Sequence, residues 1–148
     1  MIKIENVDHL GIRVTDPKRA LDFYKILGFE LHKKVDFDNV IIVKNANNVE
    51  INFIVNGADH LGGKNILMDV PEKHPGFTHV GLRVASILEV LKTLEENNIT
   101  PSQGPVTFGN DGHVSVFIRD PDRNVIELRA RLEDESKIPG LVFYDPEP

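Results

Sequence analysis

The fold of this chain is decided by the stretch His9-Leu10-Gly11-Ile12-Arg13-Val14, which returns 70 residues later as His79-Val80-Gly81-Leu82-Arg83-Val84. His, Gly, Arg and Val recur identically, with aliphatic residues between them. Both stretches alternate with a period of two, which is typical of a half-buried β-strand. The chain is therefore predicted to contain two copies of one structural unit.

Each predicted strand leads into an amphipathic helix. In the first copy Asp16 is a candidate N-cap, Pro17 suits the first helical position, and Gly28 is a natural stop. In the second copy Ser86 and Glu89 form a capping-box pattern. Apolar residues recur at helical spacing in both segments: Ala20, Phe23, Tyr24 and Leu27, then Ile87, Val90, Leu91 and Leu94.

Strand-like segments follow each helix, at residues 30–36, 40–44 and 49–55 and again at 105–108, 113–119 and 125–130. The predicted fold class is therefore α+β, with two tandem βαβββ modules at residues 4–55 and 77–131 and a linker at 56–76. One helix covers only one face of such a sheet, so the modules are expected to form a curved mixed sheet around a hollow. Residues 1–132 would make a single domain, followed by an extension at 133–148.

The composition excludes several classes of protein. With 148 residues, a net charge of −6 and no cysteine, we expect no disulfide scaffold, no thiolate metal site and no nucleic-acid partner. Without an apolar run near the ~20 residues that span a bilayer, and without a signal-peptide pattern, a cytoplasmic protein with no membrane partner is predicted. The extension carries a net charge of −4 in five carboxylates and Lys137, and its Leu141–Tyr144 segment could dock on the body or on a second subunit.

Strand alternation sorts side chains between the two faces of each module. The apolar set is expected to face the helices: Leu10, Ile12 and Val14, and Val80, Leu82 and Val84. The other set is expected to point into the hollow: His9, Gly11, Arg13, Glu50 and Asn52, and His79, Gly81, Arg83, Glu127 and Arg129. One phase of a further strand, with His113, Ser115 and Phe117, is predicted to line the same pocket.

Two imidazoles and two carboxylates on the concave face suggest a metal site. His9, Glu50, His79 and Glu127 are the candidate ligands, suited to one divalent ion of Zn, Ni, Co, Mn or Fe(II). The alternative is that the histidines are structural and that the arginines on this face neutralise the two glutamates. We favour the metal site, because candidate ligands recur in both repeats, although the His-to-Glu spacing is 41 residues in the first copy and 48 in the second.

The chain resembles the vicinal oxygen chelate superfamily, which includes glyoxalase I, bleomycin-resistance proteins and extradiol dioxygenases. The resemblance spans residues 4–131 and rests on four stretches: Asp8–Val14, Ala20–Phe29, Thr78–Gly81 and Phe117–Leu128. Resemblance to glyoxalase I implies ligands at His9, Glu50, His79 and Glu127, whereas extradiol dioxygenases and fosfomycin-resistance transferases keep a set that matches His9, His79 and Glu127. Glu50 is therefore the discriminating residue, and its presence favours glyoxalase-like chemistry.

The resemblance implies a divalent-metal-dependent lyase or isomerase that acts on a small oxygen-chelating substrate by metal-assisted proton transfer. Glu127 would be the base, or Glu50 from the other side, and Arg13, Arg83 and Arg129 would orient an anionic group. The alternatives are an Fe(II) or Mn(II) extradiol-type dioxygenase with Glu50 paired to arginine, and a dimeric resistance protein that sequesters a small molecule. A homodimer is expected, with modules paired within or between chains. The linker shows no recognisable glutathione-binding pattern.

Overall fold

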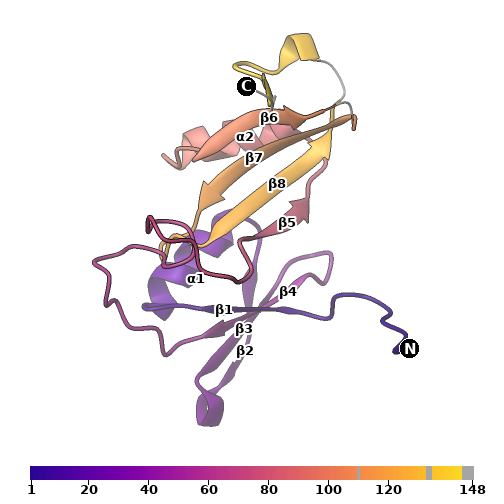
Figure 1. Cartoon of the computed structure of the whole chain (residues 1–148). Coiled ribbons are helices and arrows are strands. Elements are labelled where there is room, and N and C mark those ends of the chain that lie inside the picture. The colour runs from indigo at the N-terminus through magenta and orange to yellow at the C-terminus, as the bar shows by residue number, and fades with distance from the viewer. Residues whose placement is uncertain (110, 133–134, 145–148) are drawn as a thin grey trace. The chain divides into compact units, whose positions relative to one another are not determined.

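The computed structural model describes residues 1–109, 111–132 and 135–144, and the chain divides into two units, Met1–Lys64 and Asn65–Pro148 (Figure 1). Each unit contains one βαβββ module with a mixed sheet. This confirms the predicted α+β class and the internal repeat. Among the described residues, no helix has both the length and the apolar character needed to cross a membrane.

The first unit is built from β1 (Leu10–Arg13), α1 (Pro17–Ile26), β2 (Glu30–Val35), the 3-10 helix η1 (Asp36–Asp38), β3 (Val40–Lys44) and β4 (Glu50–Ile54). The strand order is β1-β4-β3-β2, with β1 parallel to β4 and the other pairs antiparallel. As predicted, Asp16 caps α1 by accepting a hydrogen bond from the Arg19 amide at 3.0 Å. Gly28 ends the helix at φ +85°, a left-handed backbone that glycine adopts readily.

The core of the first unit lies between α1 and one face of the sheet. The buried sheet residues alternate along their strands: Ile12 and Val14, Ile41 and Val43, Ile51 and Phe53. Tyr24 of α1 is only 1% exposed, and its ring centroid is 5.0 Å from that of Phe53. The burial of Ile12 and Val14 agrees with the predicted strand phase.

The second unit repeats this plan and adds one strand. It contains β5 (His79–Arg83), α2 (Ile87–Glu96), β6 (Gln103–Phe108), β7 (His113–Arg119), β8 (Val125–Arg131), η2 (Glu135–Lys137) and β9 (Val142–Tyr144). The strand order is β5-β8-β7-β6-β9. The pairs β5–β8 and β6–β9 are parallel, and β6–β7 and β7–β8 are antiparallel.

Strand β9 comes from the C-terminal extension. It pairs with β6 through Val106↔Val142, Thr107↔Phe143 and Phe108↔Tyr144. The rings of Phe108 and Tyr144 lie 5.2 Å apart, and Ile138 is buried. Of the two docking partners considered for this segment, the structure shows the body of the same chain. The predicted acidic residues Glu133, Asp134, Asp145 and Glu147 lie outside the described residues.

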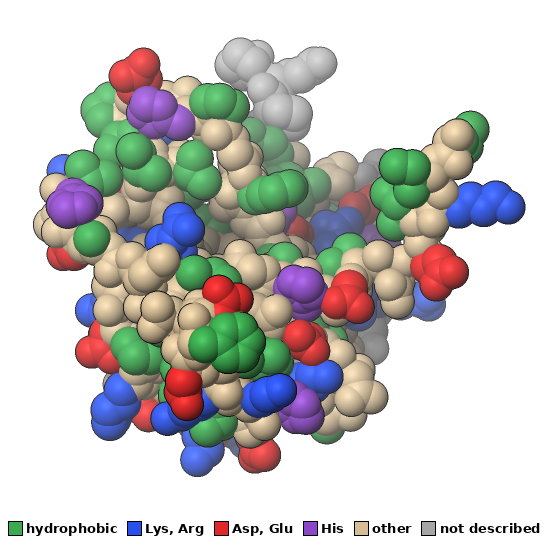
Figure 2. All heavy atoms as spheres, turned by 90° about the horizontal axis from the view of Figure 1, so that it is seen from below, with side chains coloured by type: hydrophobic (Ala, Val, Ile, Leu, Met, Phe, Trp, Pro, Cys, Tyr) green, Lys and Arg blue, Asp and Glu red, His purple; other side chains and the backbone are tan. Residues whose placement is uncertain are grey.

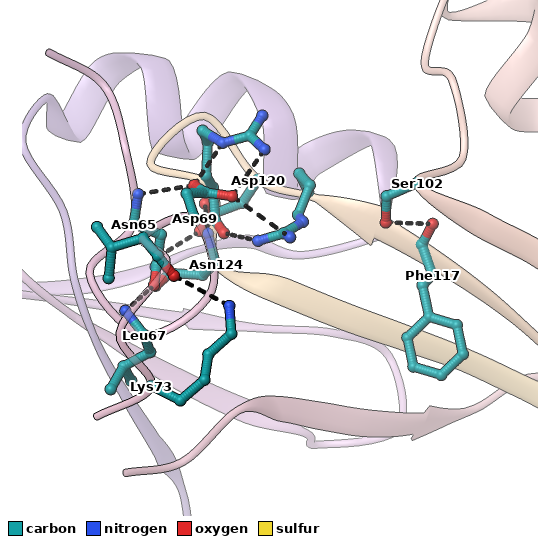
Figure 3. A network of polar contacts seen from close by, with 11 residues as sticks. Asn65, Leu67, Asp69, Lys73, Ser102, Phe117, Asp120 and Asn124 are labelled. Atoms are coloured by element: carbon teal, nitrogen blue, oxygen red, sulfur yellow. Dashed lines mark hydrogen bonds and ion pairs between the residues drawn. The ribbon is translucent and has the colours of Figure 1, made fainter. Parts of the chain in front are cut away.

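The second half of the linker is anchored on the turn between β7 and β8 (Figure 3). The Asp69 carboxylate accepts hydrogen bonds from Arg123 Nε at 2.6 Å and Nη2 at 2.9 Å, and from the Asn65 amide at 2.7 Å. Asn65 also donates to Asn124 at 3.2 Å. Chiefly through the Arg123 hydrogen bonds, the pKa of Asp69 is lowered to about 2. Residues 65–69 therefore belong structurally to the second unit.

Candidate functional site

The second module gathers five side chains into what we call the Glu127 cluster: His79, Ser115, Phe117, Glu127 and Arg129. Glu127 is 8% exposed, and its Oε2 lies 3.1 Å from His79 Nε2. Its Oε1 accepts a hydrogen bond from Ser115 Oγ at 2.6 Å and lies 3.4 Å from Arg129 Nη1. A buried carboxylate is thus satisfied on one oxygen by a hydroxyl and a guanidinium, while the other oxygen meets an imidazole.

Strand register assembles this cluster. In the parallel β5–β8 pair Gly81 is opposite Glu127, and in the antiparallel β7–β8 pair Phe117 is opposite Glu127 and Ser115 opposite Arg129. A Cβ at Gly81 would lie 3.5 Å from Glu127 Oε2, so the glycine lies directly beside that oxygen. The register therefore places Ser115, Phe117, Glu127 and Arg129 on one face of the sheet.

The orientation of His79 is fixed by two neighbours. Thr78 Oγ1 is 3.0 Å from His79 Nδ1, and the Phe117 ring meets the imidazole edge-on at 5.8 Å. The other ring nitrogen, Nε2, is therefore the one that lies next to Glu127. Two ligands about 2.1 Å from one metal ion and at right angles to each other are separated by about 3 Å, so this nitrogen–oxygen pair fits adjacent positions of a coordination shell. The same separation suits a hydrogen bond in the metal-free protein.

Arg129 is held by carboxylates, including one that sequence reasoning missed. Its Nη2 forms an ion pair with Asp111, and its Nη1 is 3.3 Å from Ser115 Oγ. The hydrogen bond from the His113 backbone amide lowers the pKa of Asp111, and the side-chain hydrogen bond from Arg129 lowers it further. Because Arg129 already contacts Glu127 and Asp111, it is better placed to position Glu127 than to bind an anionic substrate. The sequence could have indicated this contact, because Asp111 lies in a turn two residues before His113, which was predicted to line the pocket.

In the first module the predicted site residues have other partners. His9 Nδ1 lies 2.7 Å from Asp8 Oδ1, and Arg13 Nε donates to Asn56 Oδ1 at 3.0 Å. Glu50 Oε2 is 2.9 Å from Lys44 Nζ. Glu50 is therefore neutralised by a lysine of its own sheet, rather than by the arginines considered above.

Within the described part of the chain, no three histidine, aspartate or glutamate side chains come together closely enough to hold a metal ion. The four predicted ligands fall two in each unit. Of these four, the structure brings together His79 and Glu127. The four-ligand site remains a prediction.

The strand register shows that Glu50 and Glu127 do not occupy equivalent positions. Gly11 pairs with Asn52 in the first module, whereas the matching Gly81 pairs with Glu127 in the second. In strand register the counterpart of Glu127 is therefore Asn52, and Glu50 lies two residues before it on β4. The alternation could not reveal this, because residues two apart on a strand share a face.

The remaining predicted pocket residues lie on β5 and β7. Ser115 is buried, His113 and Phe117 are half-buried, and Arg83 is exposed. Among the described side chains visible in Figure 2, basic and acidic groups are interspersed rather than gathered by sign. Arg13 and Arg83, which were predicted to orient an anionic group of the substrate, are both exposed.

A family model described as the Glyoxalase/Bleomycin resistance protein/Dioxygenase superfamily matches residues 6–128. The chain belongs to this superfamily. Within it, the chain is 30% identical over 132 residues to the glyoxalase domain-containing protein RDO1 of Mycosarcoma maydis, a match that covers 87% of this chain and 70% of that protein.

Solved structures of similar fold include an integron cassette protein from the mobile metagenome of Vibrio cholerae, with a TM-score of 0.63 and 25% identity over 88% of this chain and 98% of that one. Another is the virulence protein STM3117 of Salmonella typhimurium, with a TM-score of 0.65 and 25% identity over 88% of this chain and 99% of that one. A glyoxalase/dioxygenase from Nostoc punctiforme shares the fold at a TM-score of 0.65 and 20% identity, over 86% of this chain and 92% of that one.

Proposed function

We propose that this superfamily member is a metal-dependent enzyme that acts on a small substrate bound through neighbouring oxygen atoms. The observation that carries the proposal is the His79–Glu127 pair, with 3.1 Å between a ring nitrogen and a carboxylate oxygen on one sheet face. His79 and Glu127 would hold a Zn, Ni, Co, Mn or Fe(II) ion together with His9 from the first module. When bound, the ion would supply Lewis-acid stabilisation of negative charge on the substrate oxygens.

The residues around Glu127 suit it to hold or move a proton. Ser115 and Arg129 donate to Oε1, which fixes the carboxylate in place. Glu127, bound weakly or not at all by the ion, would take up the proton from the carbon next to a substrate carbonyl. This supports glyoxalase-like proton transfer, as in a lyase or isomerase, as the first candidate reaction. Arg13 and Arg83 would orient an anionic group of the substrate.

A second candidate, Fe(II)- or Mn(II)-dependent ring cleavage, is favoured by a specific observation. Glu50 is paired with Lys44 at 2.9 Å, so one of the two carboxylates of a glyoxalase I set is already engaged by a lysine. Two histidines and one carboxylate are the ligand set of many non-haem Fe(II) oxygenases. Sequestration of a small molecule without metal is the third class, and it makes no use of the His79–Glu127 pair.

Metal analysis combined with turnover separates these classes. We expect the purified chain to bind one divalent ion, and Glu127→Gln to lose it while Glu95→Gln on the exposed face of α2 keeps it. Turnover of methylglyoxal with glutathione, or exchange of an α-ketol hydrogen with D2O, supports proton transfer; oxygen uptake with catechols supports ring cleavage. A chain that neither contains metal nor gains activity with Ni, Zn, Mn or Fe would overturn the enzyme proposal.

We also propose that the chain forms a homodimer, which light scattering would show as twice the 16.6 kDa chain mass. Refolding a 1:1 mixture of the His9→Ala and His79→Ala chains distinguishes pairing of modules within a chain from pairing between chains. If modules pair between chains, about a quarter of all sites regain both histidines by random combination. If modules pair within a chain, no site regains both. A monomer at all concentrations would contradict the dimer.

A further inference from the structure

A row of aromatic rings crosses one face of the second module, from the Glu127 cluster to the C-terminal strand. It begins at Phe117, whose ring centroid is 5.8 Å from that of the His79 imidazole. The Phe117 and Phe108 rings are nearly perpendicular, with their centroids 6.1 Å apart. The Phe108 ring in turn lies 5.2 Å from that of Tyr144. We call Phe117, Phe108 and Tyr144 the aromatic row.

Strand register explains why these rings share a face of the sheet. In the β6–β7 pair Val106 is opposite Ser115, and in the β6–β9 pair Phe108 is opposite Tyr144. Residues two apart on a strand share a face, so Phe108 and Phe117 lie on the same side as Ser115. The aromatic row and the Glu127 cluster therefore form one surface, and all of its residues belong to the second unit.

The aromatic row is partly exposed, although its rings are apolar. Phe117 and Phe108 are half-buried, and Tyr144 is 47% exposed. A covered aromatic side chain buries about 150–250 Å², so three half-exposed rings offer roughly 300 Å². A stable interface with a second copy of the chain needs about 800 Å² from each partner. The row is therefore too small to hold a protein partner by itself and has the size of a subsite for a small molecule.

We infer that the aromatic row is the part of the substrate site that determines specificity, and that it binds an aromatic ring of the substrate. The inference rests on the proposed function, which places the substrate oxygens at the Glu127 cluster. A substrate held there has the row beside it, because Phe117 belongs to both. A flat ring packs edge-to-face or offset against such side chains, whereas a charged group would lose its hydration there without gaining a partner. Through Tyr144, the C-terminal extension would contribute directly to specificity.

The test compares two ligands that carry the same neighbouring oxygens, 3-phenyllactate and lactate. Their dissociation constants are measured by isothermal titration calorimetry on the full chain with Mn(II) present. The phenyl compound is expected to bind at least tenfold more tightly than lactate. Tyr144→Ala and Phe108→Ala are each expected to reduce this preference at least threefold, with the lactate affinity within twofold of wild type. Phe143→Ala is the matched control, because Phe143 is also on β9 and exposed, but pairs with the buried Thr107.

A purely structural role of the rings would change other quantities. Loss of the contact between Phe108 and Tyr144 would then lower the melting temperature and weaken the binding of both ligands to the same extent. An unchanged ratio of the two dissociation constants in both variants would overturn the inference. A change of oligomeric state in Tyr144→Ala but not in Phe143→Ala would assign the row to a second copy of the chain, and would also overturn it.

Tyrosine fluorescence provides a second readout. The chain has no tryptophan, and its two tyrosines are Tyr144 and Tyr24, which is 1% exposed in the core of the first unit. Saturating 3-phenyllactate is expected to change the emission of wild type and to leave that of Tyr144→Phe unchanged, whereas lactate changes neither. Unchanged emission of wild type with 3-phenyllactate would contradict contact with Tyr144.

A Glu127→Gln variant separates this inference from the proposed function. If wild type binds both ligands equally and Glu127→Gln binds neither, the inference fails and the proposed function stands. If the phenyl preference depends on the aromatic row but binding is unaffected by Glu127→Gln and by His79→Ala, the proposed function fails and the ring preference stands. If wild type binds neither ligand, both fail.

Discussion

Ser115 is the residue on which the orientation of Glu127 depends most directly, because its hydroxyl donates to Oε1 at 2.6 Å while Arg129 Nη1 is at 3.4 Å. Groups that hydrogen-bond to metal ligands typically contribute 10- to 100-fold to metal affinity. We therefore expect Ser115→Ala to weaken metal binding about tenfold in a titration of the metal-free protein. Ser102→Ala is the matched control, because its hydroxyl donates to the backbone carbonyl of Phe117 (Figure 3) rather than to a side chain of the Glu127 cluster. Equal losses in both variants would count against a ligand role for Glu127.

Asp69 connects stability to pH. Hydrogen bonds from Arg123 lower its pKa in the folded chain to about 2, below the ordinary value of 3.8 for an aspartate. Asp69 therefore stabilises the fold fully above about pH 4, and this contribution is lost as the pH falls from about 4 to about 2. The side chain is only 10% exposed, and the shift corresponds to about 2 kcal/mol. Urea unfolding at pH 7 is expected to show Asp69→Asn destabilised by about that amount, with a shallower loss of stability below pH 4.

Asp38→Asn, on the exposed 3-10 helix η1, serves as the control for Asp69→Asn and is expected to unfold as wild type does at both pH values. The Asp69 prediction fails if the free energy of unfolding of Asp69→Asn differs from that of wild type as much at pH 2 as at pH 7.

At the scale of elements, β9 covers the edge of β6. Its side chains are about half exposed, so backbone pairing and the Phe108–Tyr144 contact at 5.2 Å are its main contributions. Deleting residues 141–148 is expected to lower the melting temperature by roughly 5 °C. The uncovered edge of β6 is also expected to pair with other chains, giving species larger than those of the full chain in size-exclusion chromatography. Val142→Thr, which keeps a β-branched residue, is the control. Unchanged melting and elution after the deletion would show that β9 does not protect the edge.

The two helices show how far an element can be predicted from its own sequence. The Asp16 and Ser86 caps and the apolar stripes place α1 and α2 at Pro17–Ile26 and Ile87–Glu96, close to the predicted segments. Strands were predicted less completely. β6 begins at Gln103 rather than 105, and β9 was missed because Val142–Tyr144 has no alternation of its own and forms only against β6.

For the whole molecule, binding of the proposed metal ion would stabilise the folded state. A ligand that binds only the folded state adds about 2.7 kcal/mol at a hundred times its dissociation constant. We therefore expect saturating Mn(II) or Zn(II) to raise the melting temperature in calorimetry and to sharpen the transition. Mg(II), which imidazole binds poorly, is the control ion. His79→Ala and His9→Ala should each abolish the shift, and a shift that survives loss of His9 would place the ion in the second unit alone.

The sequence by itself determined the repeat, the two modules, their helices and the face of each strand. These features depend on the spacing of residue types within one local segment of the chain, which the sequence displays directly. Only the tertiary structure decided which residues are neighbours across strands: Asp111 with Arg129, Asp69 with Arg123, and Asn52 rather than Glu50 at the place of Glu127. The last of these has a simple physical reason. Glu50 and Asn52 are two residues apart and share a face of β4, so alternation cannot distinguish them. The β1–β4 register does, and it is set by packing over the whole module.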